Sequence, residues 1–163
     1  MLNDEVKAND APALGFGKGL EDRASVVGRL MIEVFGPDGE LKERRELHNL
    51  VVTAGKGLIA SRMCNAGTAP THMAIGTNST AAAAGDTTLG TEAGRVALTS
   101  STPTSNTATY VASFPAGTGT GAIVEAGILN ASSGGTLLCR SVFSVVNKAA
   151  GDSMSITWVL TFN

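Results

Sequence analysis

The C-terminal stretch of this chain alternates between large apolar and mostly small polar side chains, and this alternation constrains the fold more than any other feature. The apolar positions are Met154, Ile156, Trp158, Leu160 and Phe162. The positions between them are Ser153, Ser155, Thr157, Val159 and Thr161. Because successive side chains of a β-strand point to opposite faces, a period of two predicts a strand over residues 152–162 with one face in a core.

Residues 25–52 show the same alternation in two runs separated by a turn. The apolar face of the first run consists of Val26, Leu30, Ile32 and Val34. The sequence Gly-Pro-Asp-Gly follows at residues 36–39, and proline and glycine are the residues that a tight turn favours. We therefore predict a β-hairpin over residues 25–52.

One short helix is expected after the hairpin. Thr53 can cap its first turn, and apolar side chains recur at helical spacing over residues 54–65. The Asn-Ala-Gly sequence at residues 65–67 suits the end of a helix.

The rest of the chain reads as one strand after another, apart from a long polar loop over residues 77–91. The predicted strands between residues 72 and 162 cover 73–76, 94–101, 107–114, 122–129, 136–146 and 152–162. With the hairpin this makes about eight strands, and turns follow one another at short intervals. The sequence therefore predicts a mainly β protein, an antiparallel β-sandwich with one short helix, in a single domain over residues 25–163.

Charged residues are concentrated in the first third of the chain. Residues 1–49 hold 17 of the 26 charged side chains, and residues 50–163 hold only nine. The densest group, Lys-Glu-Arg-Arg-Glu at residues 42–46, mixes both signs and is expected to be a solvated strand face. A pI near 5.6 and a net charge of −2 argue against nucleic-acid binding. A region with so few charges either exposes Ser, Thr, Gly and Ala to water or faces other protein.

Residues 1–24 have weak periodicity and are predicted to form an extended N-terminal arm. Their apolar residues would suit a partner's groove, and we take four of them as candidate subunit-contact residues: Val6, Leu14, Phe16 and Leu20. No signal peptide and no apolar run long enough for a membrane span is present in the sequence, so no membrane contact is expected.

No set of residues with the spacing of a catalytic, cofactor or metal site is found. Cys64 and Cys139 are far apart in sequence, and we expect two buried, reduced thiols, although a cross-link between them or between chains stays open. His48 and His72 are expected to be ordinary strand residues. Glu125 lies in an apolar strand and is expected to form a structural ion pair with Arg95 or Arg140. The protein is therefore expected not to be an enzyme and to have no cofactor.

Three stretches together resemble virion structural proteins of tailed bacteriophages. They are residues 47–63, with Asn-Leu-Val-x-x-x-Gly, residues 71–98, with Ile-Gly-Thr and Asp-Thr-x-Leu, and residues 116–162, with Glu-Ala-Gly-Ile and Thr-Trp-x-Leu-x-Phe. The resemblance covers roughly residues 47–162 and leaves residues 1–24 outside. It is a pattern of strands and turns without a catalytic signature.

The resemblance implies a structural role in the virion. A head decoration (cement) protein on the capsid exterior, with the major capsid protein as partner, fits the length and the arm. The alternative is a tail-fibre, collar or baseplate component. For either role we expect assembly in the host cytoplasm, contacts with other virion proteins and self-association, for which a trimer is our expectation.

Overall fold

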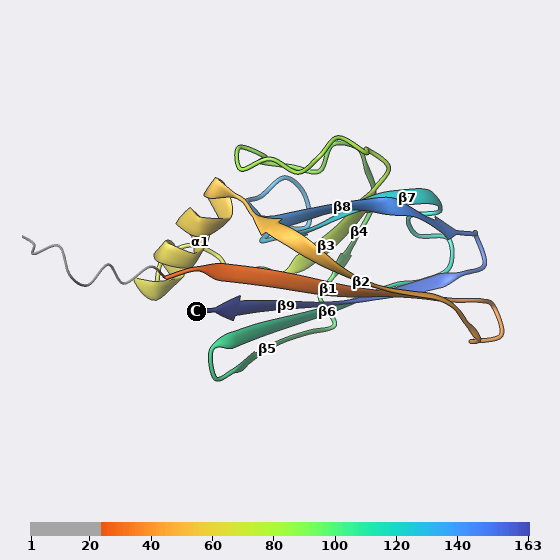
Figure 1. The fold of residues 1–163 in the computed structure, drawn as a ribbon, viewed down its shortest axis with the longest axis horizontal. Coiled ribbons are helices and arrows are strands. Elements are labelled where there is room, and N and C mark those ends of the chain that lie inside the picture. The colour runs from red at the N-terminus through yellow and green to blue at the C-terminus, as the bar shows by residue number, and fades with distance from the viewer. Residues whose placement is uncertain (1–23) are drawn as a thin grey trace, which may run out of the picture.

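The computed structural model describes residues 24–163, and within them the chain forms nine antiparallel strands and one helix (Figure 1). The strands before the helix are β1 (Val26–Phe35) and β2 (Leu41–Val51), and the helix is α1 (Thr53–Met63). After it come β3 (His72–Gly76), β4 (Glu92–Ala97), β5 (Ser100–Thr104), β6 (Thr107–Phe114), β7 (Gly121–Leu129), β8 (Leu137–Lys148) and β9 (Ser153–Phe162). This confirms the predicted mainly β, antiparallel architecture with one short helix.

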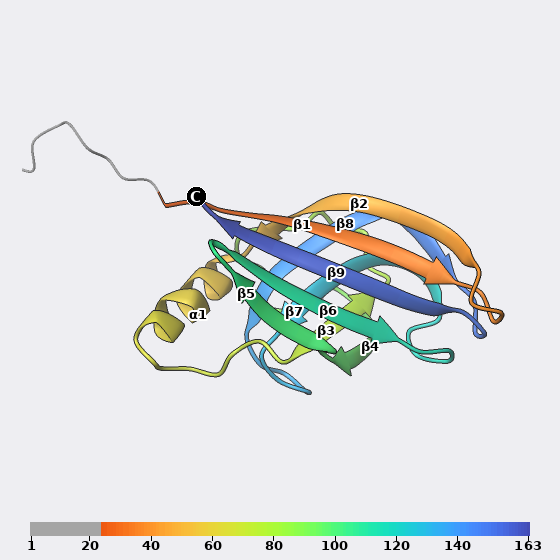
Figure 2. The same cartoon turned by 90° about the horizontal axis from the view of Figure 1, so that it is seen from below.

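The strands form one sheet that curls into two facing layers (Figures 1 and 2). Their order is β4-β3-β7-β8-β2-β1-β9-β6-β5. One layer consists of β4, β3, β7 and β8, and the other of β2, β1, β9, β6 and β5. The two layers of the expected sandwich are therefore joined, through β8 and β2, into a continuous sheet.

The join between the layers is short, because β2 and β8 pair only at Leu50 with Arg140 and at Val51 with Cys139. Beyond these pairs Arg45 bridges the diverging strands. Its guanidinium donates hydrogen bonds of 2.9 Å to the carbonyl oxygens of two β8 residues, 144 and 145. The prediction that residues 42–46 form a solvated strand face is confirmed for Lys42, Arg44 and Glu46, which are exposed, whereas Arg45 is half-buried by its contacts with β8.

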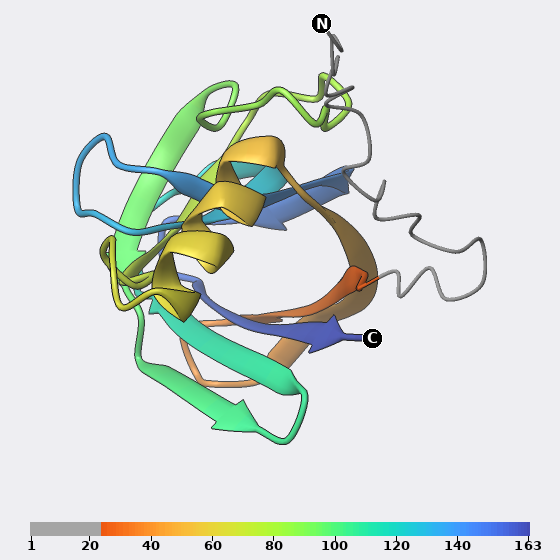
Figure 3. The ribbon, with the colours of Figure 1, turned by 90° about the vertical axis from the view of Figure 1, so that its left-hand side faces the viewer.

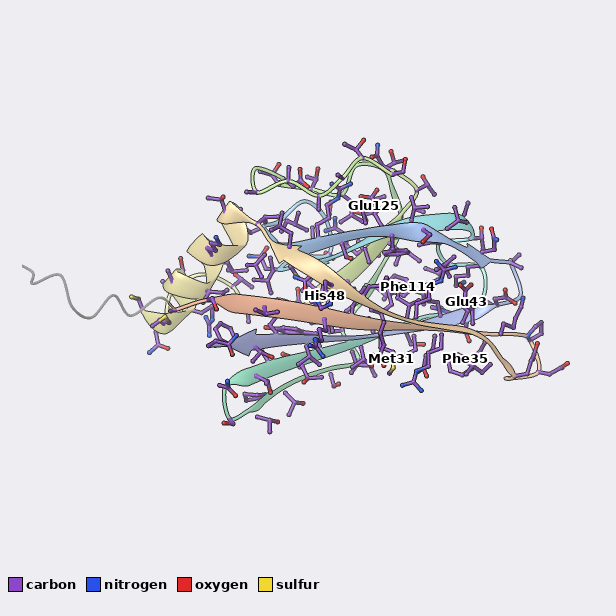
Figure 4. The ribbon with its side chains drawn as sticks, viewed as in Figure 1. Met31, Phe35, Glu43, His48, Phe114 and Glu125 are labelled. Carbon is purple, nitrogen blue, oxygen red and sulfur yellow. The ribbon has the colours of Figure 1, made fainter. Side chains whose placement is uncertain are left out.

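The core lies between the layers, where the alternation predicted it. On β9, Met154, Ile156, Trp158 and Leu160 are buried, while Phe162 at the strand end is 37% exposed. Figure 4 shows Phe114 between the two layers. Figure 4 also places Met31 and Phe35 on the outer side of β1, opposite the buried Ile32 and Val34.

The predicted strand over residues 94–101 is two strands, which explains why nine are present rather than eight. β4 pairs with β3 in one layer, and β5 pairs with β6 in the other. The chain crosses between the layers at Leu98 and Thr99. The Leu98 amide donates to the Thr71 carbonyl at 2.9 Å, and the Thr99 amide donates to the Val111 carbonyl at 2.7 Å. Both amides therefore stay hydrogen-bonded at the crossing. The alternating pattern of the sequence continues through it and does not show that one strand ends and another begins.

The helix closes one end of the molecule (Figure 3) and begins two residues after the pairing of β2 with β8. The expected role of Thr53 as its cap is wrong. Val52 is the cap residue, and among residues 24–163 no side chain caps the helix start. The Thr53 amide instead donates to the carbonyl of Ala84 in the long loop, at 2.8 Å, so the loop supplies the missing acceptor.

Gly55 sets how closely α1 approaches β8. A Cβ atom at this position would lie 1.9 Å from the carbonyl oxygen of Leu138, so only glycine fits.

In the part of the chain that the structure describes, no helix has the length and apolar character needed to cross a membrane.

Candidate functional site

Glu125 on β7 is fully buried, and its carboxylate is the centre of a polar cluster under the long loop (Figure 4). Oε1 accepts hydrogen bonds from the backbone amides of Thr91, at 2.8 Å, and Asn78, at 3.2 Å. Oε2 accepts one from the Gly90 amide at 2.9 Å. Arg140 on β8 also donates to Oε2 through Nε at 2.9 Å, and its Nη2 forms an ion pair with the same oxygen at 2.8 Å. Of the two expected partners of Glu125, Arg140 is the one that the structure shows.

Arg140 extends this cluster to the tip of the loop. Its Nη1 donates to Oδ2 of Asp86 at 2.8 Å, and its Nη2 donates to the Thr80 carbonyl at 3.1 Å. The same Asp86 oxygen accepts the amide of Ala83 at 2.9 Å. Together the two carboxylates and the guanidinium hold residues 77–91 against the outer face of β7 and β8.

The electrostatics keep this cluster ionised. Burial alone would raise the pKa of Glu125, but hydrogen bonds from the Thr91 and Gly90 amides and from Arg140 outweigh it and lower the pKa. The backbone hydrogen bond from Ala83 is the main reason that the pKa of Asp86 is lowered. Burial works against the charge on Arg140, yet its hydrogen bonds to Asp86 and Glu125 raise its pKa. A general base needs a pKa near the working pH, so these carboxylates are unsuited to that role.

The loop that this cluster holds is also an apolar cover. Leu89 packs with Ala74, Leu129, Leu137 and Val52 in a second, smaller core. This core lies on the outer side of the layer formed by β4, β3, β7 and β8. β7 is therefore buried on both faces, with all seven residues from Ile123 to Leu129 buried. Residues 77–91 were expected to be only a long polar loop, although the apolar run on both faces of β7 indicates a strand that is covered on both sides.

A second polar cluster lies at the opposite end of the molecule from α1. Lys148 is 1% exposed, and its Nζ donates to the carbonyl oxygens of Pro115, at 2.9 Å, and Asp152, at 2.7 Å. Oδ2 of Asp152 accepts from Nζ of Lys42 and from the Ala149 amide, at 2.8 and 3.0 Å. The Lys42 hydrogen bond is the main cause of a lowered pKa at Asp152, and burial lowers the pKa of Lys148. This cluster joins the β1–β2 hairpin to the loops before β7 and β9.

The histidines and cysteines do not converge with either cluster. His48 is exposed on β2, and Nδ1 of His72, at the start of β3, lies 2.8 Å from Oγ1 of Thr71. Both cysteines are free thiols, but the expectation that both are buried is wrong for Cys64, which is exposed just after the end of α1. Cys139 is buried, and burial raises the pKa of its thiol. Within residues 24–163, no three His, Cys, Asp or Glu side chains form a group that could hold a metal ion.

Most of the nine charged residues of the charge-poor region are paired within the molecule. Six of them form ion pairs: Asp86, Glu92, Arg95, Glu125, Arg140 and Asp152. A seventh, Lys148, is buried against two carbonyl oxygens. Lys56 and Arg62 remain, and both are exposed on α1. The surface formed by residues 50–163 away from α1 is therefore nearly neutral.

A depression of about 580 Å³ lies on the outer face of β1 and β9. Its lining combines apolar and hydroxyl side chains, namely Val27, Met31, Thr157, Val159 and Thr161. Arg29 and Glu46 stand at its border with β2, and Val27 is 45% exposed. A shallow face of this composition suits contact with another protein better than enclosure of a small molecule.

The proposed arm residues Val6, Leu14, Phe16 and Leu20 lie outside the described residues. Comparisons with known proteins found no matching protein-family model, no matching curated protein and no matching solved structure.

Proposed function

We propose that this protein is a non-enzymatic structural protein of a tailed-bacteriophage virion, and more specifically a decoration (cement) protein on the outer surface of the head. It binds the major capsid protein and copies of itself, in a trimeric arrangement. Stabilisation of the particle comes from area buried between subunits rather than from chemistry at a site.

The observation that supports this proposal is the nearly neutral surface of residues 50–163 away from α1. It is neutral because Arg140, Lys148 and their partners interact with one another inside the molecule. Solvent-facing sheets of soluble proteins usually carry Lys and Glu, which guard against association. Here the outer face of β9 instead presents Ser153, Ser155, Thr157, Val159 and Thr161, each half-buried. Such a face loses little solvation free energy when another subunit covers it.

The two polar clusters support a structural role in a second way. Glu125 and Asp152 hold loops to the sheet at several points each, so the loop over β7 and β8 and the end opposite α1 are fixed before any partner binds. A rigid surface loses less conformational entropy on association than a mobile one. Residues 1–24, with their four apolar anchors, are proposed to add contacts with neighbouring subunits.

Localisation in the particle tests the proposal directly. The full-length protein, labelled at a single introduced cysteine (Ser133→Cys in a Cys64→Ser background), is incubated with virions of the phage that encodes it. Ser133 lies in the exposed β7–β8 turn, away from the proposed contact face. Label spread over the head in electron microscopy supports decoration. Label at one vertex or on the tail would contradict decoration and support a role as a tail-fibre, collar or baseplate component. Absence of label from virions would overturn the proposed virion role.

A matched pair of charge substitutions tests the contact face. Thr157→Glu places a carboxylate in the depression on β9, and Ser132→Glu places one in the β7–β8 turn. We expect Thr157→Glu to lower occupancy on particles at least about tenfold, because an unpaired charge would be covered by the partner. Ser132→Glu should bind as the unmodified protein does. Equal binding by the two variants would show that this face of β9 is not the contact.

A further inference from the structure

Beside α1, a groove of about 420 Å³ opens onto the main core. Its floor is made of core residues, Leu58, Leu138 and Leu160, each no more than 6% exposed. Its rim includes Met63, which is 84% exposed, and Phe162, which is 37% exposed. The lining is mostly apolar, so the groove is a point at which the core meets solvent through a ring of exposed hydrophobic side chains.

The described chain begins next to this groove. The Ser25 amide donates to the Asn163 carbonyl at 2.9 Å, and the Asn163 amide donates back to Ser25 at 2.9 Å. Val26 is paired directly with Phe162 of the groove rim. Figure 3 shows the C-terminus and α1 at this same end of the molecule. Ser25, near the start of the described chain, therefore lies beside the rim.

The sequence of residues 1–23 suits the groove in both apolar content and charge. Phe16 and Leu20 are its last large apolar residues before Ala24, and the acidic pair Glu21 and Asp22 follows. On the facing side, both charged residues of α1 are basic, and one of them, Arg62, lines the groove. Phe16 precedes Ala24 by eight positions, and a chain of eight residue steps can extend to about 26 Å.

We propose that the chain's own N-terminal segment covers this groove in the free protein, with Phe16 and Leu20 as its anchors. The segment is tethered beside the rim, so its effective concentration there is in the millimolar range, and a separate copy at ordinary concentrations is outcompeted. The contact hides the apolar anchors of an unassembled subunit. It goes beyond the virion role, because it concerns the protein before it meets any particle.

The exposed thiol of Cys64 provides the test, because it follows Met63 at the groove rim. In the full-length protein, Lys18→Cys places a second thiol between the two anchors while leaving both in place. Diamide, as oxidant, joins the two thiols in a disulfide and takes up their two hydrogens. We expect a monomeric cross-linked species, and expect it to be lost when Cys64→Ser is added.

The matched control keeps the tether and removes the anchors. In Lys18→Cys with Phe16→Ser and Leu20→Ser, the monomeric cross-link should form at least about tenfold more slowly, since burying even one such side chain stabilises a contact by about 1.5–3 kcal/mol. Met63→Asp, on an 84% exposed side chain, should slow it similarly. Equal rates with and without the anchors overturn the proposal. Dimers cross-linked at micromolar protein between the introduced thiol of one copy and Cys64 of another also overturn it and indicate exchange of the segment between copies. Neither result bears on the labelling of virions.

Discussion

Nε of Arg140 lies 2.9 Å from Oε2 of Glu125 on the neighbouring strand, and this buried pair connects the sheet to the loop that covers it. The two residues are diagonal neighbours, since Arg140 is paired with Gly127 and Glu125 with Val142. Three loop amides complete the solvation of the carboxylate. A charge that would be costly to bury alone is therefore matched on every side.

Removing the charge of Glu125 should destabilise the protein strongly. Glu125→Gln leaves Arg140 without its buried counter-ion and turns an amide donor toward the loop amides. Breaking a buried pair in this way costs about 3–5 kcal/mol. Urea unfolding followed by circular dichroism measures this loss as a lower midpoint.

Glu92→Gln is the control for this substitution, because Glu92 pairs with Arg95 on β4 and its side chain is 35% exposed. An ion pair of this kind contributes less than about 1 kcal/mol. If both variants lost the same stability, the Glu125 cluster would not have the structural importance assigned to it.

Acid should destabilise the fold through the same cluster. The pKa values of Glu125 and Asp86 are lowered in the folded protein, so the unfolded chain binds protons at a higher pH than the folded one. Their contribution is complete above the ordinary carboxyl pKa of about 4–4.5 and is lost as the pH falls through the lower folded values. Urea midpoints should therefore be level from pH 7 to about pH 5 and fall below that. In Arg140→Met the fall should be shallower, and an identical slope would contradict this origin.

The parts of this fold that the sequence predicted are those that depend on interactions between residues close together in the chain. The alternation of Met154, Ile156 and Trp158 identified a strand and its buried face, because that pattern depends only on the pleat of the backbone. The same reasoning treated residues 94–101 as one strand. The crossing at Leu98 is made by hydrogen bonds to residues 71 and 111, which local patterning does not register.

The candidate site was predictable in part for the same reason. An acidic residue in an apolar strand indicated that Glu125 needs a cation, and Arg140 was one of two proposed. The long loop was predicted to be an ordinary polar connection. It covers the outer face of β7 through only one apolar side chain, Leu89, and through backbone amides that bind Glu125. Backbone donors have no signature in the sequence.

The two glycines of α1 should respond oppositely to alanine. A Cβ atom at Gly55 meets the Leu138 carbonyl oxygen at 1.9 Å, whereas one at Gly57 meets no atom within 4 Å among the described residues. Gly55→Ala should push the helix off β8 and cost about 1–3 kcal/mol. Gly57→Ala should stabilise by up to about 1 kcal/mol, since alanine is the better helix former. Thermal unfolding of the two variants gives the comparison, and a shift of the same sign in both would contradict the close approach at Gly55.

The hydrogen bond from Trp158 to Asn49 offers a spectroscopic test of the core. Nε1 of Trp158 donates to Oδ1 of Asn49 at 3.0 Å, and the Asn49 side chain lies over Gly28 of β1. Asn49→Ala leaves the indole donor without this acceptor at a buried position. The expected loss of stability is about 1–3 kcal/mol.

Trp158 is the only tryptophan of the chain, so its emission reports on this position alone. In Asn49→Ala, water that replaces the lost amide oxygen should shift the emission of the native protein to longer wavelength. His48→Ala, at the preceding exposed position of β2, should change neither the emission nor the stability by more than about 0.5 kcal/mol. An unshifted emission in Asn49→Ala, together with unchanged stability, would show that the indole does not depend on Asn49. Because Asn49 lies next to the short pairing of β2 with β8, a loss of stability there would also weaken the join between the two layers.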